Sequence, residues 1–130
     1  MRQNLILLAA LFTINLLFGQ THFYVNGITG NDNNAGTSVA TSWKTIQKAC
    51  NAATAGGIVH IAPGTYTESL EPHVSGTANN LISFKADAPE TVFIDGTGTN
   101  FICLLRVENR SYLRFENLVF QNLTKNACNG

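Results

Sequence analysis

The chain has 130 residues, of which 45% are apolar and 12% are charged, and its eight basic residues balance its eight acidic ones. This length and composition are typical of one folded domain with few surface charges, which argues against intrinsic disorder. No run of basic residues occurs, so nucleic acid is not an expected partner.

The N-terminus has the pattern of an export signal. Arg2 provides a positive charge, an apolar run extends from Leu5 to Phe18, and Gly19 is a small residue suited to cleavage. A membrane-spanning helix needs about 20 apolar residues, so this run is short for that role. We predict a signal peptide over residues 1–19, secretion to the extracellular space or the cell surface, and no stable membrane anchor. A retained anchor is the alternative.

A short strand is predicted at residues 22–25, followed by a loop over residues 26–38 that is rich in Gly, Asn and Asp. Asn and Asp side chains in such loops bond nearby backbone groups and form turns. Asp32 is the only carboxylate of this loop, whereas a calcium loop gathers several. The loop is therefore predicted to be a structural turn and not a metal site.

The next segment has the spacing of an amphipathic helix. Ser42 is a suitable N-cap, and Gly56-Gly57 ends the pattern. Apolar positions three or four residues apart fall on one helix face. These positions are Trp43, Ile46, Ala49, Cys50 and Ala53.

From residue 58 onward, short strands alternate with turns. In GGIVHIAPGTYTE, residues 56–68, an alternating apolar stretch ends at Pro63-Gly64, because proline donates no hydrogen bond and glycine opens the positive-φ region. Hairpins, sandwiches and solenoids all contain such short strands. The interval at which the pattern recurs distinguishes between them.

Two columns of apolar residues each repeat at an equal interval along the chain: Val59, Ile82 and Leu105 form the first, and Tyr66, Val92 and Leu118 form the second. Intervals of about 25 residues fit one coil of a β-solenoid, in which the residues of a column stack on one another. The residues two positions after the first column, Ile61, Phe84 and Val107, are apolar as well. Alternation along each strand turns both sets inward and the residues between them, His60, Ser83 and Arg106, outward. We predict an all-β solenoid whose first coil is covered by the helix; a β-sandwich is the alternative.

The three cysteines, Cys50, Cys103 and Cys128, allow at most one internal disulfide. Cys50 lies on the apolar side of the predicted helix, and Cys103 lies beside a predicted strand. The favoured interpretation is that both are small buried apolar residues. A bridge between Cys50 and Cys103 is the alternative.

Several stretches of the chain resemble secreted bacterial proteins of the right-handed parallel β-helix superfamily, which includes pectate-lyase-like and chondroitinase-B-like polysaccharide lyases. These stretches are FYVNGITGNDNNAGTS, SWKTIQKACNAATAGGIVHIAPGTYTE, SGTANNLISFKADAPETVFIDG and YLRFENLVFQN. The resemblance covers about residues 23–122. It implies that residues 20–130 are the N-terminal cap and first three coils of a β-helix domain that is incomplete.

The resemblance also implies a function in polysaccharide metabolism. In the lyases of this superfamily a cation, often calcium, neutralises a uronate carboxylate while a Lys or Arg removes the adjacent proton. Those groups lie in later coils, so no catalytic residue is assigned here. We expect no turnover by this chain itself, and calcium is implied by the resemblance only.

Arg106 and Arg114 are the cations predicted to face outward from strands. A guanidinium group suits a uronate carboxylate, so these two residues are the candidate substrate-binding residues. The alternative is that they form ion pairs with Glu108 or Glu116 on the polar surface. His60 has no partner fixed by the sequence and is interpreted as a surface residue.

Two hypotheses of function follow. The first is the N-terminal part of a secreted carbohydrate-active β-helix protein, a lyase or glycosidase acting on or binding acidic polysaccharide. The second is a non-catalytic surface or adhesion protein whose stacked coils present a binding face. The oligomeric state is left open by the sequence.

Overall fold

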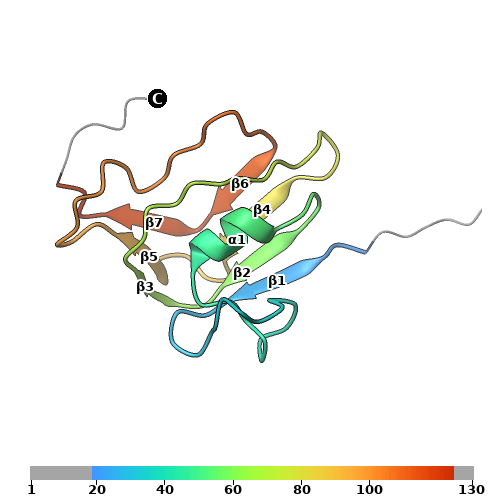
Figure 1. The fold of residues 1–130 in the computed structure, drawn as a ribbon, viewed down its shortest axis with the longest axis horizontal. Coiled ribbons are helices and arrows are strands. Elements are labelled where there is room, and N and C mark those ends of the chain that lie inside the picture. Colours follow the sequence, from blue (N-terminus) through green and yellow to red (C-terminus); the bar gives the residue numbers. More distant parts are fainter. Residues whose placement is uncertain (1–18, 125–130) are drawn as a thin grey trace, which may run out of the picture.

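The computed structural model describes residues 19–124 (Figure 1). This part of the chain is mostly β, with two parallel sheets and one short helix, α1 (Ile46–Ala52). The first sheet, sheet A, has the order β1 (His22–Val25), β2 (Ile58–Ile61), β4 (Ile82–Ala86) and β6 (Leu113–Glu116). The second, sheet B, has the order β3 (Gly64–Tyr66), β5 (Val92–Asp95) and β7 (Leu118–Gln121). The predicted signal peptide lies almost wholly outside the described residues.

The chain passes from sheet A to sheet B three times, from β2 to β3, from β4 to β5 and from β6 to β7. Each strand then pairs in parallel with a strand of the preceding passage. A third side is marked by a parallel bridge between Leu70 and Leu105, whose backbone bonds with neighbouring residues measure 2.9 Å. The arrangement is β-helix-like and forms no closed barrel within residues 19–124. Within residues 19–124, α1 has seven residues, and no helix of this part of the chain could span a membrane.

The space between the sheets is filled by side chains that alternate along the strands. Each is at most 1% exposed, and the set comprises Val59, Ile61, Ile82, Phe84, Val92 and Ile94. Burial of one such side chain stabilises the fold by about 1.5 to 3 kcal/mol. The inward direction predicted for the strand at 58–61 and for Ile82 and Phe84 is confirmed.

The predicted register of sheet A is wrong. Val59 pairs with Phe84 and not with Ile82, and Phe84 pairs in turn with Phe115. Leu105 lies outside sheet A and pairs with Leu70 on the third side. The equal spacing of Val59, Ile82 and Leu105 led to the wrong pairing because the loops between coils differ in length. A coil therefore has no fixed number of residues.

In sheet B the prediction is half right. Val92 pairs with Leu118, which confirms the stacking predicted for these two residues. Tyr66, however, pairs with Ile94 rather than with Val92. Its hydroxyl group donates to the carbonyl of Ala62 at 2.8 Å, which holds the ring against the bend between β2 and β3.

Helix α1 begins at Ile46 with Thr45 as its N-cap, because the Thr45 hydroxyl accepts a hydrogen bond from the N–H of Lys48 at 3.1 Å. The predicted N-cap, Ser42, is buried but precedes an extended residue. Trp43 lies outside the helix because its backbone N–H donates to the carbonyl of Tyr24 on β1 at 2.9 Å. The helix is therefore shorter at both ends than the sequence pattern indicates.

Two carboxylates hold the start of α1. Asp32 accepts from the N–H groups of Lys44 and Thr45 at 2.8 and 2.9 Å, and Glu68 accepts from those of Ile46 and Gln47 at 3.1 and 2.9 Å. Partial burial raises the pKa of Asp32, but the hydrogen bonds from Thr45 and Lys44 outweigh it and lower this pKa. Burial raises the pKa of Glu68 more than its hydrogen bonds lower it. Asp32 is thus a structural residue of the loop, as predicted.

The two ends of the stack differ. At the N-terminal end, the loop that contains Gly36 and Trp43 bonds the backbone of β1, and α1 lies against the segment from Glu71 to His73 through bonds of 2.8 and 2.9 Å. At the C-terminal end, Leu113, Phe115 and Leu118 are only half-buried. The last described coil therefore lacks the cover that the first one has.

The cysteines have two different states. Cys50 is a free, buried thiol on α1, and burial raises its pKa to about 12. Cys103 is half-buried and takes part in a disulfide. The prediction of a small buried residue is confirmed for Cys50 and wrong for Cys103, and a bridge between these two residues is wrong as well. Cys128 lies outside the described residues.

Asp95, at the end of β5, ties its coil to the next one. Its carboxylate accepts from the N–H of Thr97 at 2.6 Å and from the side-chain amides of Gln121 and Asn122 at 2.7 and 2.8 Å. These hydrogen bonds, with those from Thr97 foremost, hold the pKa of Asp95 well below its usual range.

We expect Glu68→Ala to lower the free energy of unfolding by about 1 to 3 kcal/mol, because two N–H groups at the start of α1 lose their acceptor in a half-buried place. Urea denaturation at pH 7, followed by circular dichroism, measures this loss. Glu108→Ala is the control, because Glu108 is exposed and pairs with Arg106 at the surface; we expect a change within about 1 kcal/mol. Equal losses in the two variants would contradict the role of Glu68.

The stability provided by Asp95 depends on pH. A carboxyl group whose pKa is lowered in the folded state contributes fully above its ordinary value of 3.8, and this contribution is lost as the pH falls through the folded value. We therefore expect Asp95→Asn to melt at a lower temperature than the wild type at pH 7, and the gap to narrow between pH 4 and pH 2. A gap independent of pH would refute the role of the charge.

Candidate functional site

The outer face of sheet A carries a row of polar side chains that the register places side by side. Tyr24 on β1 pairs with His60 on β2, His60 with Lys85 on β4, and Lys85 with Glu116 on β6. In a parallel sheet without a stagger, paired residues point to the same face. The row therefore brings together residues that lie far apart in the sequence.

His60 is the centre of a hydrogen-bonded chain on this face. Its Nδ1 lies 3.0 Å from Oδ1 of Asp87, and its Nε2 lies 2.9 Å from Nδ1 of His22. The rings of His22 and Tyr24 stack on the His60 ring, with centroids 5.2 and 5.1 Å away. Lys85 approaches the same Asp87 oxygen at 3.7 Å.

The chemistry of the groups sets the direction of these bonds when both rings are neutral. The hydrogen bond from His60, aided by the charge of Lys85, lowers the pKa of Asp87, so its carboxylate accepts the proton of His60 Nδ1. His60 Nε2 is then an acceptor, and His22 donates to it through Nδ1. This leaves the Nε2 lone pair of the exposed His22 as a proton acceptor toward solvent.

A hollow of about 200 Å³ lies next to this chain of residues. Tyr24 and His60 border it from the sheet, Val39 borders it from the loop before α1, and Asp87 provides a carboxylate. Val39 is 69% exposed. The hollow thus combines an aromatic ring and an apolar side chain with hydrogen-bonding groups, as small-ligand sites do.

The sequence analysis did not predict this cluster because it assumed the wrong register between β2 and β4. The equal spacing of the apolar columns placed Ser83 beside His60, whereas the true partner is Lys85, which is close to Asp87 in the sequence. His60 lies on the outer face, as predicted, but its side chain is 19% exposed and bonded at both nitrogens, so it has two partners that the sequence did not indicate. Only the correct strand pairing could have indicated them.

The two arginines proposed for substrate binding lie in different places. Arg114 is exposed on β6 and donates to Glu116 at 3.2 Å. Arg106 follows Leu105 on the third side and bonds Glu108 through Nε at 2.8 Å. Arg106 therefore does not lie on a regular strand, which differs from the prediction. Each arginine pairs with a glutamate, and the two arginines do not form one site.

Arg106 also borders a second hollow, of about 600 Å³. Glu71 and Ser69 line one part of it, and Phe101 and Ile102 line another. Ile102 is 60% exposed. This hollow offers a cation beside an apolar surface.

The calcium ion that the resemblance allows has no ligand set in the described part of the chain. No group of three or more His, Cys, Asp or Glu residues within residues 19–124 is arranged to hold a metal ion. Asp32, the carboxylate of the glycine-rich loop, is engaged by backbone N–H groups at the start of α1.

Comparisons with known proteins extend this description. Residues 28–74 match the family model DUF1565, described as a protein of unknown function. A structure described as the complex of XylC with xylose is 32% identical, covers 58% of this chain and has a TM-score of 0.53. No curated protein matches the chain.

A second solved structure is the GH136 lacto-N-biosidase from Eubacterium ramulus in its native form. It is 17% identical, covers 84% of this chain and has a TM-score of 0.66, a likeness that concerns the fold alone. This chain spans 12% of the length of XylC and 21% of the length of the lacto-N-biosidase.

The proton arrangement at His60 can be tested by nitrogen-15 NMR. At pH 8 we expect His22 and His60 to carry their proton on Nδ1, because Asp87 fixes the His60 tautomer and His60 fixes that of His22. His73, which lies outside the cluster, is the internal control. We expect Asp87→Ala to shift both rings toward the Nε2 tautomer, and unchanged spectra would show that Asp87 does not orient them.

Proposed function

We propose that residues 20–130 form the N-terminal cap and first coils of a secreted right-handed parallel β-helix that binds polysaccharide, or acts on it as part of a lyase-like enzyme. The likeness to the complex of XylC with xylose, at 32% identity, is the observation that carries the carbohydrate role. The lacto-N-biosidase supports the fold. The signal-like N-terminus supports secretion.

The architecture supports the β-helix part of this proposal. Strands of sheets A and B alternate along the chain and pair in parallel, and Leu70 and Leu105 mark a third side. The loop before α1 lies beside β1, the first strand of sheet A, and bonds its backbone, and α1 contacts the same strand (Figure 1). This is where a capping helix covers the first coil of a solenoid.

Acidic polysaccharide is the substrate class that we propose first, with the hollow beside Arg106 as its place. A guanidinium group binds a carboxylate through two parallel hydrogen bonds, and Phe101 and Ile102 offer an apolar surface to a sugar ring. The bond from Arg106 to Glu108 is exposed, so a uronate carboxylate can replace it at little cost. Arg114 is the second proposed carboxylate contact, on another side of the coil.

The hollow beside Tyr24 and His60 favours a second candidate, a neutral sugar. Asp87 is 69% exposed there, and this hollow, unlike the one that Glu71 and Arg106 line, has no arginine on its wall to offset the repulsion between a carboxylate and a uronate. A neutral pyranose can donate hydroxyl groups to Asp87 while it contacts Tyr24. The xylose in the XylC complex is a neutral sugar of this kind.

Binding of polygalacturonate and of xylan by the purified chain, measured by affinity electrophoresis and calorimetry, separates the two candidates. We expect polygalacturonate to bind and Arg106→Ala to weaken this binding about tenfold, which corresponds to about 1.4 kcal/mol. Arg110→Ala is the matched control, because Arg110 is an exposed arginine that lines neither hollow.

The remaining outcomes are also decisive. Binding of xylan that Tyr24→Ala weakens, without binding of polygalacturonate, would select the neutral-sugar candidate and overturn the acidic one. Binding of neither polymer would favour the non-catalytic surface or adhesion protein. Release of unsaturated uronide by the chain alone would show that it contains catalytic groups which we have not assigned.

A further inference from the structure

We propose that the ring pair of His22 and His60 is a proton-operated switch, and that proton uptake at mildly acidic pH creates a binding site for a uronate carboxylate on the outer face of sheet A. The switch rests on the proposed polysaccharide function, because it takes the acidic sugar from that proposal and adds a dependence on pH. It is separate from the hollow beside Arg106, because no described residue that lines that hollow is a histidine.

One hydrogen bond joins the two rings, and it needs one N–H group and one lone pair. Nδ1 of His22 and Nε2 of His60 lie 2.9 Å apart. When both rings are neutral, Nδ1 of His60 donates to Asp87 at 3.0 Å, so Nε2 of His60 accepts from His22. A first proton adds to Nε2 of the exposed His22 and leaves both hydrogen bonds in place.

A second proton breaks the bond between the rings. It goes to Nε2 of His60, because the hydrogen bond from His60 lowers the pKa of Asp87 and keeps that carboxylate ionised. Two N–H groups of two cationic rings then face each other across 2.9 Å and repel. His60 is held by Asp87 and is 19% exposed, whereas His22 is the exposed first residue of β1. His22 therefore turns away, and Nε2 of His60 becomes a free donor.

The charged and titratable groups that share this face with His60 come from three neighbouring elements. They are His22 and Tyr24 on β1, Lys85 and Asp87 on and after β4, and Arg114 and Glu116 on β6. The loop before α1 borders the adjacent hollow with uncharged residues. The four groups that are charged at neutral pH form two ion pairs and cancel. Proton uptake by both rings therefore gives this face two positive charges that nothing balances.

A uronate carboxylate fits the protonated state. It accepts the freed proton of His60 Nε2, and a hydrogen bond between two ionised groups is about twice as strong as a neutral one. Lys85, which pairs with His60 in the sheet and is 32% exposed, places a second cation beside the carboxylate. Tyr24 borders the adjacent hollow and contacts the sugar ring. A carboxyl group of ordinary pKa, about 3.5 for one next to an electron-withdrawing carbon, stays ionised at pH 5.

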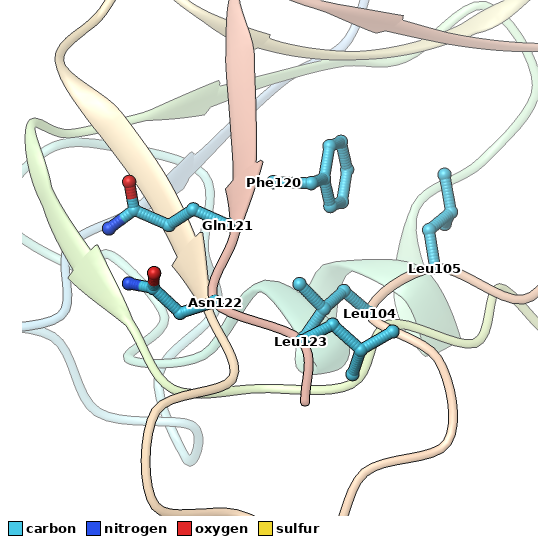
Figure 2. A pocket seen from close by; sticks show the side chains of 6 residues that line it. All are labelled: Leu104, Leu105, Phe120, Gln121, Asn122 and Leu123. Carbon is cyan, nitrogen blue, oxygen red and sulfur yellow. The ribbon is translucent and has the colours of Figure 1, made fainter. Parts of the chain in front are cut away.

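The hollow at the last described coil has no comparable response to acid. Its volume is about 320 Å³, and Figure 2 shows the side chains around it. These are Leu104, Leu105, Phe120 and Leu123, with the amides of Gln121 and Asn122 turned toward β5. None of these side chains gains a proton between pH 8 and pH 5. The response to pH is thus specific to the outer face of sheet A.

Nitrogen-15 NMR of the purified chain tests the switch without any ligand. At pH 8 we expect a coupling across the hydrogen bond between His22 Nδ1 and His60 Nε2. At pH 5 we expect this coupling to vanish while the bond from His60 to Asp87 persists. His73, which lies outside the cluster, is the internal control. Absence of the coupling at pH 8, or its persistence at pH 5, would overturn the switch.

Calorimetry with oligogalacturonate tests the carboxylate site. The Arg106→Ala variant serves as the background, because it removes the contact in the other hollow. We expect this variant to bind at least about tenfold more tightly at pH 5 than at pH 8, which corresponds to about 1.4 kcal/mol. Adding His60→Gln, which keeps a hydrogen-bonding side chain that takes up no proton, should reduce the gain to less than about threefold. Adding His73→Gln, the matched control, should leave the gain unchanged.

Circular dichroism and the urea midpoint at both pH values show whether each variant folds. Equal affinity at pH 5 and pH 8 would overturn the carboxylate site, as would a gain that His60→Gln retains. None of these outcomes decides whether the wild-type chain binds polysaccharide at Arg106 or Tyr24. A failure to bind at those two residues would in turn leave the NMR result standing.

Discussion

Parallel pairing of each strand with the strand one coil earlier is the interaction on which the rest of the structure depends. A strand as short as β2 or β6 buries too little apolar surface to be stable by itself. Between two neighbours, however, its backbone groups are all bonded and its inward side chains contact those above and below, as Val59, Phe84 and Phe115 do. Each coil therefore derives its stability from its neighbours, and the ends of the stack need other contacts.

At the N-terminal end these contacts are polar. The backbone of Trp43 completes the edge of β1, and carboxylates distant in sequence accept the N–H groups at the start of α1. The helix is consequently part of the stack and not an independent unit.

The same stacking creates the chemistry of the outer face. His22, His60 and Asp87 come from three successive passages of the chain, and only the register of β1, β2 and the end of β4 joins them into one hydrogen-bonded chain. The residues that a coil buries fix the register, and the polar residues between them are placed as a consequence. The candidate site is thus sensitive to core packing at positions that never contact a ligand.

This dependence explains what could be predicted from the sequence. Alternation along a strand is a local property, so the inward direction of Ile61 and Phe84 was predictable, and so were the bend at Pro63 and the helical spacing around Cys50. Register is a property of two strands and of the loop that separates them, so its prediction failed where loop lengths vary.

The residues of the candidate site show the same difference between local and long-range information. Arg106 and Arg114 were recognised as outward cations, with nearby glutamates as their alternative partners, from their immediate neighbours in the sequence. The cluster around His60 was missed because Asp87 is 27 residues away and His22 is 38 residues away. The disulfide state of Cys103 was missed because it depends on tertiary contacts.

The pairing of cations also limits how the surface can recognise a polysaccharide. Lys85, Arg106 and Arg114 each lie within 4 Å of a carboxylate of this chain, so the long-range attraction of an acidic polymer is weak. A uronate must compete with Glu108 for Arg106, so the contact gains only about the energy by which a bidentate guanidinium–carboxylate pair exceeds an exposed ion pair. Selectivity then has to come from the shape of the hollow and from contacts with its apolar walls. The charge of Arg106 therefore favours an acidic polysaccharide only slightly, and the apolar walls of the hollow become the decisive feature.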